Sequence, residues 1–396
     1  MIEISIAKEK IVEYSTRLEV ESRLLTASAG YVLAQDIIAT LPLPLFTQSA
    51  MDGYAIRHDE DRVAEEWLTV QGESKAGSER SINLEAGKAV RIFTGAPLPQ
   101  GATAVVMQEH VTRQGDRVKI NLENVADGAH IRYQGQQIQK GEVALPMGSL
   151  LSPGAIGFLA GFGITHVAVY RKPKVAILVT GDELVDAGQP LKPGEIYESN
   201  SAMLEAALLK EGVEDIRIDA VHDDKAELVA KLDGLLKWAD LVITSGGISV
   251  GDYDYVGEAI DHLGVQTVFY KVKQRPGKPL FFGEKGGKLL FALPGNPASS
   301  LVCFYEYVFP ALRLLYGRKD IHLQSFRMPS LKAYSFKGER DEFLKGLLTP
   351  EGVMPLYGQE SFALRSFALA NALIYLPASQ QQVLPGDLVE VHVLPS

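Results

Sequence analysis

The sequence predicts a multidomain α/β protein built around a doubly wound sheet. Between Lys174 and Tyr316, apolar runs rich in β-branched residues alternate with amphipathic segments of helical length, which is typical of βαβ units. The run KVAILV, from Lys174 to Val179, has the continuous apolar character of a strand buried on both faces. Short, glycine-punctuated β-type runs precede and follow this region, and they predict smaller β domains on either side.

The elements before the doubly wound region are expected in this order. IAKEKIVEYS has apolar residues at helical spacing, and a second amphipathic helix is predicted from Glu21 to Ile38. Residues 46–133 read as a mostly antiparallel β domain. One further helix is expected with Ser152 as N-cap, Pro153 at its first position and Gly163 as its stop, followed by a strand.

Inside the doubly wound region, strands and helices follow one another as expected for a parallel sheet. The first helix is predicted to begin at Ser199 or Asn200 and to stop at Gly212. The later predicted strands are DIRIDAV, ADLVITS and TVFYKV, and the helices between them are KAELVAKLDGLLKW and DYVGEAIDHLG. The hairpin LFFGEKGGKLLFAL and the helix PASSLVCFYEYVFPALRLLYG follow. The last 75 residues or so return to β-type runs.

One short stretch, SAMDGYAI, has the local pattern of a tight β-hairpin at Asp52-Gly53. Two prolines in the preceding LPLPLF are an unusual lead-in to a paired strand. Asp52 is therefore either a turn residue or a residue with a chemical role.

Composition excludes several classes of partner. The formal net charge is −10 and no block of like charge stands out, so no nucleic-acid partner is expected. The single cysteine, Cys303, excludes an intramolecular disulfide and indicates a reducing compartment; in its apolar surroundings it is expected to be a core residue. No signal peptide is predicted, and the longest apolar run, residues 155–170, is too short to cross a bilayer. We expect a cytoplasmic protein without a membrane partner.

Polar residues follow four of the predicted strands, at the sheet edge where ligands of open α/β sheets bind. The four segments are TGDE (180–183), HDD (222–224), SGGISVGDYD (245–254) and PGNP (294–297). The glycine loop can bring backbone N–H groups to an anion, although it matches neither a P-loop nor a dinucleotide fingerprint. Carboxylates facing such a loop would repel an anion, and Mg²⁺ resolves that conflict. Helix capping by Asp223, Asp224 or Asp254 is the alternative.

Six segments together resemble a known family. They are PLPLFTQSAMDGYAI, RIFTGAPLPQGATAVVMQE, VTGDELV, SGGISVGDYDYV, RPGKPLFFG and ALPGNPASS. In this order they resemble the signature blocks of the molybdopterin molybdotransferases, the MoeA family, which includes the E domain of gephyrin. The resemblance spans nearly the whole chain.

The resemblance implies an elongated homodimer of four-domain subunits, with both subunits contributing to each active-site cleft. Residues 1–45 with 134–172 would form a linking α+β domain, and 46–133 a mostly β domain. Residues 173–318 would be the doubly wound molybdopterin-binding domain, similar in fold to molybdopterin adenylyltransferase, and 319–396 a small β domain. The implied enzyme uses Mg²⁺, inserts molybdate into adenylylated molybdopterin and releases AMP. Molybdopterin adenylyltransferase and molybdoenzyme chaperones are the implied partners.

The site residues are carried over from the matching motifs. Catalytic roles are predicted for Asp52, Glu183 and Asp254, and metal binding for Glu183, Asp223 and Asp254. Substrate contacts are predicted for Thr94, Thr180, Gly181, Ser245, Gly246, Gly247, Ser249, Gly251, Lys271, Arg275, Lys278, Pro294, Gly295, Asn296, Pro297, Arg340 and Ser361. For the three basic residues from Lys271 to Lys278, a solvated basic loop is the alternative.

Two places depart from the family pattern. Gln136-Gln137 stands where Glu-Asp is usual, so the acid expected at position 137 is replaced by a neutral acceptor. Near Ser361, Glu360 stands where a small residue is usual, Phe362 where histidine is common, and Arg365 where serine is usual. The departures keep open a non-catalytic or weakened molybdopterin-binding paralogue or scaffold. A molybdopterin adenylyltransferase also stays open, because its pterin-binding fold would give similar loops. The sequence also does not determine whether the inserted metal is molybdenum or tungsten, or which enzymes receive the cofactor.

Overall fold

The computed structural model describes residues 1–58, 66–77, 82–222, 224–248, 255–336 and 338–395. The chain divides into two compact units. The first comprises residues 1–35, 148–156 and 165–396, and the second comprises residues 36–147 and 157–164. This division is coarser than the four predicted domains, whose boundaries stay a prediction.

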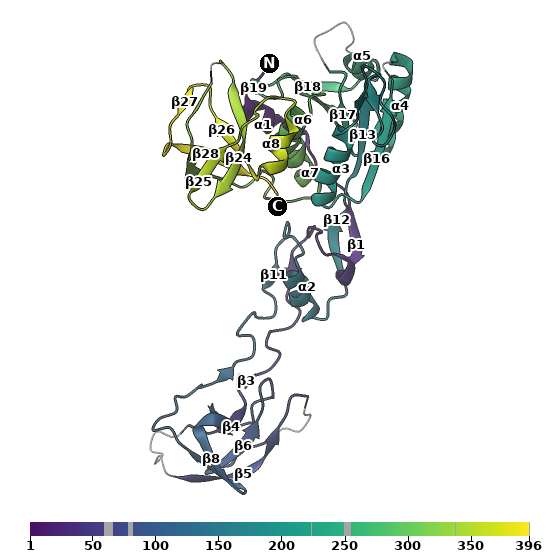
Figure 1. Cartoon of the computed structure of the whole chain (residues 1–396). Coiled ribbons are helices and arrows are strands. Elements are labelled where there is room, and N and C mark those ends of the chain that lie inside the picture. The colour runs from purple at the N-terminus through teal and green to yellow at the C-terminus, as the bar shows by residue number, and fades with distance from the viewer. Residues whose placement is uncertain (59–65, 78–81, 223, 249–254, 337, 396) are drawn as a thin grey trace. The chain divides into compact units, whose positions relative to one another are not determined.

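The first unit contains the predicted doubly wound sheet (Figure 1). Its six strands, in spatial order, are β16 (Asp215–Val221), β13 (Lys174–Thr180), β17 (Leu241–Ser245), β21 (Lys288–Leu293), β20 (Phe281–Lys285) and β18 (Gln266–Tyr270). The first four are parallel, while β20 pairs with β18 and β21 in antiparallel fashion. The predicted parallel strands and the predicted hairpin are confirmed.

Helices cover both faces of this sheet, as the apolar runs require. In β13, Val175, Ile177 and Val179 pack on the face that carries α1 (Ile4–Tyr14), α3 (Asn200–Lys210) and α6 (Pro297–Cys303). Ala176 and Leu178 alternate to the other face, which carries α4 (Lys225–Trp238) and α5 (Tyr255–His262; Figure 1). Helix α4 begins at Asp224, whose carboxylate accepts a hydrogen bond from the Glu227 N–H.

The predicted last helix of this region contains a wider turn. Helix α6 continues through the π-helical segment η3 (Phe304–Val308) into α7 (Phe309–Leu315). Pro310 has no N–H to donate to the carbonyl four residues earlier. A local π turn accommodates such a defect without ending the helix.

The C-terminal residues form a second sheet within the first unit. Its strands are β19 (Gln274–Arg275), β24 (Asp341–Thr349), β26 (Ala372–Leu376), β28 (Leu388–Val393), β22 (Ser325–Pro329) and β25 (Gly352–Pro355), which pairs with β24. Beside them lie β23 (Tyr334–Ser335), β27 (Gln382–Val383) and the short helix α8 (Leu364–Leu369). The buried Glu306 of η3 binds Lys8 Nζ at 2.5 Å and His392 Nδ1 at 2.6 Å, so it ties α1 and β28 together.

The second unit contains the predicted β domain. Its six-stranded sheet runs β7 (Ala104–Met107), β4 (Gly53–Ile56), β6 (Lys88–Ile92), β5 (Trp67–Ser74), β9 (Arg117–Ile120) and β8 (Val111–Gln114). Two ladders accompany it: β3 (Gln48–Ser49) with β10 (Ile131–Arg132), and β2 (Ile37–Ile38) with β11 (Val143–Leu145). The predicted helix and strand that follow are confirmed as α2 (Pro153–Ala160), which the unit boundary divides, and β12 (His166–Tyr170), which belongs to the first unit.

Two local predictions were wrong. The helix expected from Glu21 to Ile38 is instead strand β1 (Val20–Leu24) and the single turn η1 (Leu25–Ala27), because VESRL pairs with β12, more than 100 residues away in sequence. The hairpin expected at Asp52-Gly53 is absent, since β3 and β4 pair with other strands. A Cβ at Gly53 would lie 1.9 Å from the Val106 oxygen, so close backbone approach requires this glycine.

Among the described helices, none is long and apolar enough to cross a membrane.

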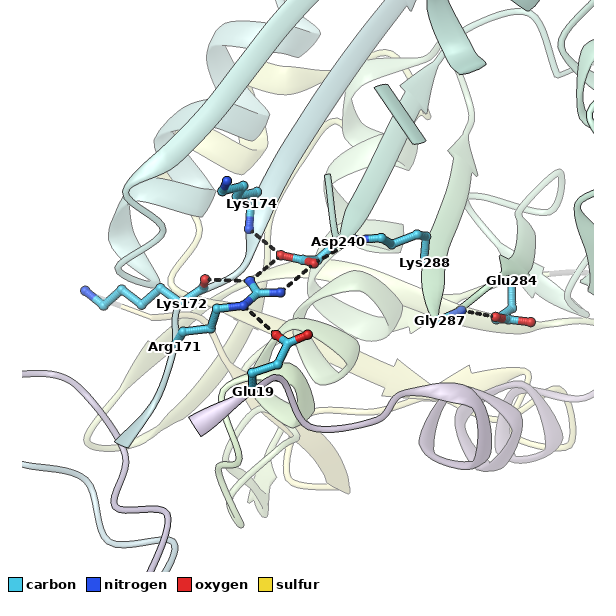
Figure 2. Close-up of polar contacts among 8 residues, drawn as sticks. All are labelled: Glu19, Arg171, Lys172, Lys174, Asp240, Glu284, Gly287 and Lys288. Atoms are coloured by element: carbon cyan, nitrogen blue, oxygen red, sulfur yellow. Dashed lines mark hydrogen bonds and ion pairs between the residues drawn. The ribbon is translucent and has the colours of Figure 1, made fainter. Parts of the chain in front are cut away.

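Asp240 connects the amino ends of β13, β17 and β21 (Figure 2). Its main chain donates to the Lys174 oxygen at 2.8 Å and accepts from the Leu289 N–H at 2.9 Å. Its carboxylate, 5% exposed, accepts two bonds from Arg171 (2.6 and 2.9 Å), one from Lys288 (3.0 Å) and one from the Lys174 N–H (2.9 Å). Burial alone would raise the pKa of Asp240, but these donors outweigh it and lower the pKa to about 2.

Replacing this carboxylate is expected to destabilise the fold. Asp240→Asn leaves Arg171 and Lys288 without their buried counter-charge, and should lower the free energy of unfolding by about 3 kcal/mol. Because the pKa of Asp240 is below its unfolded value, its contribution is complete above pH ~4 and is lost as pH falls towards ~2. Urea unfolding of both proteins from pH 7 to pH 2 measures this.

The control is Asp233→Asn, which removes an exposed helical pair with Lys237 and should leave unfolding unchanged. A loss for Asp240→Asn no larger than for this control would contradict the assignment.

Candidate functional site

A cavity of about 590 Å³ lies in the first unit, at the carboxyl ends of β13, β17 and β21. The register explains its position, because Val179 pairs with Ser245 and Ser245 with Leu293, so the three strands end level. The lining residues are Thr180, Gly181, Glu183, Leu184, Ile196, Tyr197, Glu198, Ser199, Asn200, Ser245, Gly246, Gly247, Ile248, Pro279, Pro294, Gly295, Asn296, Pro297 and Phe362. Ten of the predicted site residues thus lie together around one cavity.

Three glycines of this lining stand at positions where any larger side chain would clash with a neighbouring atom. Gly246 has φ +94° and Gly247 φ +64°, conformations that favour glycine. A Cβ at Gly246 would lie 2.7 Å from the Thr180 oxygen, and one at Gly247 2.6 Å from Val256 Cγ2. At Gly181 a Cβ would lie 2.7 Å from a Glu183 carboxylate oxygen. The loops after β13 and β17 therefore lie too close together for larger residues.

Asn200 ties the loops after β17 and β21 to each other. Its Nδ2 donates to Ser245 Oγ and to the Gly295 oxygen, both at 2.8 Å. The Gly295 carbonyl can only accept a hydrogen bond, so it fixes which end of the Asn200 amide faces the loops. The side chain of one residue thereby holds the SGG and PGNP turns at a set separation.

At the start of α3, neither Ser199 nor Asn200 caps the helix with its side chain as predicted, and Glu198 accepts a backbone hydrogen bond there instead. Ser199 occupies the N-cap position without a side-chain bond, and Asn200 turns to the loops. Glu198 accepts the Ser201 N–H at 2.9 Å and also the Ser201 hydroxyl. Just before it, β15 (Ile196–Tyr197) pairs with β14 (Leu184–Val185) and brings Tyr197 to the cavity.

The C-terminal sheet also contributes to the cavity, through residues 358–363. Ser361 Oγ accepts from Asn296 Nδ2 at 2.9 Å, and the Ser361 oxygen accepts from the Ser299 N–H at 3.2 Å. The next residue, Phe362, lines the cavity. Ser361 therefore contacts the PGNP turn directly, while its predicted contact with substrate stays a prediction.

The predicted basic residues are not among the residues that line the cavity. Lys271, at φ +69°, places its ammonium 4.5 Å from the centre of the Tyr270 ring. Arg275 binds the buried Glu342 at 3.0 Å, and Arg340 donates to the Gln274 oxygen at 3.2 Å. Lys278 is exposed and precedes the lining residue Pro279. Arg275 and Arg340 thus both contact the segment where β19 joins β24.

Asp52 and Thr94 lie in the second unit and contact each other. Asp52 Oδ1 accepts the Thr94 N–H at 2.7 Å and the Thr94 hydroxyl at 2.8 Å. These bonds, together with the charge of Arg91, hold the pKa of Asp52 below its usual value. The carboxylate is thus fixed in position, ionised and exposed. Gln137, also exposed and in this unit, bonds through its main chain to the Leu43 oxygen.

Four predicted residues, Asp223, Ser249, Gly251 and Asp254, lie outside the residues that the structure describes. Of the predicted metal ligands, only Glu183 is described. Within the described ranges, no group of three or more His, Cys, Asp or Glu side chains could hold a metal ion. The metal site therefore stays a prediction.

Sequence reasoning missed four lining residues that can bear on a ligand: Tyr197, Glu198, Asn200 and Phe362. Asn200 was considered only as a helix cap, and Phe362 only as a departure from a family pattern. The available signal was position, since residues 196–200 immediately precede a helix at the ligand-binding edge of the sheet.

The chemistry available in the cavity is that of binding and electrostatics. The Glu183 carboxylate and the Thr180 and Ser245 hydroxyls line it together with backbone-exposing glycines. Cys303 is fully buried, and burial raises the pKa of its thiol well above the usual value, so it is not an available nucleophile. Such a site can hold a polar substrate in position for reaction, and a cation would be needed wherever the substrate places negative charge beside the carboxylates.

The comparisons with known proteins cover the whole chain. Residues 2–163 match the MoeA N-terminal region (domain I and II), 176–314 a probable molybdopterin binding domain, and 327–394 the MoeA C-terminal region (domain IV). A molybdopterin molybdenumtransferase of Haemophilus influenzae is 35% identical, over 99% of this chain and 98% of that protein. Molybdopterin molybdenumtransferase 2 of Mycobacterium tuberculosis is 37% identical over 93% of each chain.

The fold agrees with these sequence relationships. The crystal structure of a molybdopterin biosynthesis MoeA protein from Pyrococcus horikoshii OT3 is similar, with a TM-score of 0.86 and 28% identity, over 99% of this chain and all of that one. The three family regions follow one another in the order that the six sequence segments predict. This chain therefore belongs to the MoeA family of molybdopterin molybdenumtransferases.

Proposed function

We propose that this protein is a molybdopterin molybdotransferase, which inserts molybdate into adenylylated molybdopterin and releases AMP. The observation that carries the proposal is the cavity at the carboxyl ends of β13, β17 and β21, within the segment that matches a molybdopterin binding domain. Its volume of about 590 Å³ is within the usual range for small-molecule sites. Relatives named molybdopterin molybdenumtransferase support the same reaction.

Mg²⁺ is part of the proposal. Glu183 presents an exposed carboxylate at the cavity, and carboxylate oxygens with phosphate oxygens are the ligands that Mg²⁺ prefers. Glu183 would hold the ion with Asp223 and Asp254. When bound, the ion would neutralise charge on the pyrophosphate of the substrate.

The protein's own residues contribute position and charge. The Ser245 and Thr180 hydroxyls and the SGG and PGNP turns would hold the molybdopterin end of the substrate. Lys271, Arg275 and Lys278 would supply positive charge for phosphate or molybdate. Asp52, held by Thr94, would orient the attacking water or molybdate.

We further propose a homodimer that acts in the cytoplasm, supported by the family resemblance and by the single cysteine, which suits a reducing compartment. Molybdopterin adenylyltransferase as supplier of the substrate and molybdoenzyme chaperones as receivers of the product are proposed on the resemblance alone.

The reaction can be tested directly. The purified full-length protein should release AMP from adenylylated molybdopterin only when molybdate and Mg²⁺ are both present, as measured by chromatography of AMP. Glu183→Gln keeps the shape of the side chain but removes its charge, and should lower the rate about 100-fold. Glu227→Gln, on the exposed first turn of α4, is the matched control and should retain the wild-type rate.

AMP release without molybdate would contradict a molybdotransferase. Binding of substrate without any AMP release would favour the non-catalytic carrier, and ATP consumption without AMP release would favour the adenylyltransferase.

Asp52 can be tested in the same assay. Asp52→Ala should lower molybdate-dependent AMP release by about tenfold or more, and circular dichroism should show an unchanged fold because the residue is exposed. Asp116→Ala, at an exposed turn of the same unit, controls for loss of a surface charge. Wild-type turnover by Asp52→Ala would show that this residue has only a local structural role.

The role of Asn200 in positioning the two turns has a structural readout. Asn200→Ala removes both hydrogen bonds of Nδ2 and should lower the free energy of unfolding by about 1–2 kcal/mol. Amide hydrogen exchange should accelerate at residues 245–248 and at Gly295 and Asn296, and stay unchanged in α4. Asn121→Ala, which breaks an exposed pair with Thr112, should change neither region. Unaltered amide exchange in Asn200→Ala would show that the Asn200 side chain does not hold the two turns in place.

A further inference from the structure

Phe362 places an aromatic ring in solvent at the edge of a mostly polar cavity. The residue is 67% exposed and lines the cavity. A single exposed apolar side chain is common on protein surfaces, so exposure alone assigns no role. What distinguishes Phe362 is the number of bonds that hold the backbone around it.

The segment 358–363, which carries Phe362, is fixed from one side by Lys345. Lys345 Nζ donates to the Glu360 oxygen at 3.1 Å and to the Ala363 oxygen at 3.3 Å. The Gln359 side chain donates to the Lys345 oxygen and accepts from the Lys345 N–H, both at 2.9 Å. The carbonyls on both sides of Phe362 are therefore held from β24.

Lysine is an unusual residue at position 345, because the side chain that donates these hydrogen bonds is almost fully buried. Burial lowers the pKa of Lys345 to about 8, which reflects the cost of placing an ammonium group in the interior. Two carbonyls of segment 358–363 offset part of that cost. A buried cation directed at one surface segment indicates that the conformation of this segment matters.

The opposite side of the segment is fixed to the cavity itself. Ser361 accepts bonds from Asn296 and from the Ser299 N–H, and Ser366 Oγ donates to the Gly358 oxygen and, at 2.9 Å, to the Ala363 oxygen. The backbone of Phe362 is thus already in place when a ligand arrives, which lowers the ordering cost of binding.

We propose that Phe362 is a specificity-determining residue that stacks on a planar fused-ring heterocycle of the substrate. The ring is available, pre-positioned and next to the glycine and proline turns, and a flat π face is what an aromatic side chain offers beyond apolar contact. Tyr197, 47% exposed and also in the lining, provides a second aromatic ring from strand β15 of the short ladder with β14. The inference rests on the proposed function, whose substrate carries two fused-ring heterocycles, a pterin and an adenine.

Calorimetric titration of the full-length protein with free pterin and with AMP separates these two rings. Phe362→Ala should weaken binding of one probe by about tenfold, as loss of one aromatic stack does elsewhere. Phe362→Trp should bind within about twofold of wild type, whereas Phe362→Leu, apolar but not aromatic, should resemble Phe362→Ala. The affected probe identifies the ring that stacks.

Tyr357→Ala is the matched control. Tyr357 is 88% exposed and only five residues away, but it lies outside the cavity lining and contacts Lys332. This variant should bind both probes as the wild type does, and thermal melting of every variant verifies the fold.

Three results would overturn the inference: wild-type affinity of Phe362→Ala for both probes, wild-type affinity of Phe362→Leu, or no binding of either probe to the wild type at millimolar concentration. Failure of the proposed function is distinguishable, because it would appear as absent molybdate-dependent AMP release while the Phe362 variants still discriminate a probe. Unchanged probe binding with intact AMP release would overturn only the role of Phe362.

Discussion

The buried carboxylate of Asp240 fixes β13, β17 and β21 level with one another at their amino ends. Its main chain bonds to both neighbouring strands, and its side chain gathers Arg171, Lys288 and the Lys174 N–H. Parallel strands have evenly spaced bonds and no hairpin to set their register. A buried charge whose hydrogen bonds reach all three strands therefore favours the alignment in which they begin level.

The cavity is the consequence of that alignment at the opposite edge. Because Val179, Ser245 and Leu293 lie side by side, the three following loops converge. Glycines at 181, 246 and 247 allow the close approach, and the Asn200 amide holds two of the loops together. The resulting site contains hydroxyls, the carboxylates of Glu183 and Glu198, and backbone groups, while the buried thiol of Cys303 is not available. Its chemistry is that of binding and orienting a polar substrate, whose negative charge would need a cation beside the carboxylates.

The second sheet completes the cavity from a different part of the chain. Lys345, buried beneath segment 358–363, and Asn296, at the PGNP turn, hold that segment from two sides. Phe362 consequently lines a cavity whose other lining residues lie between Thr180 and Pro297. Of the departures from the family pattern around Ser361, Phe362 lines the cavity, whereas Gln137 lies in the other unit.

The sequence by itself determined the local order of strands and helices in the α/β region, because continuous apolar runs and helical periodicity are properties of neighbouring residues. It also placed TGDE, SGG and PGNP at one edge, because topology alone requires this of parallel strands. Only the tertiary structure decided that VESRL is a strand, since its partner β12 is remote in sequence. It likewise decided that Gly53 serves close packing against β7, that Asn200 joins two loops rather than capping a helix, and that Phe362 lies at the cavity. These outcomes depend on which backbone lies opposite a residue, and that is settled by long-range pairing and burial.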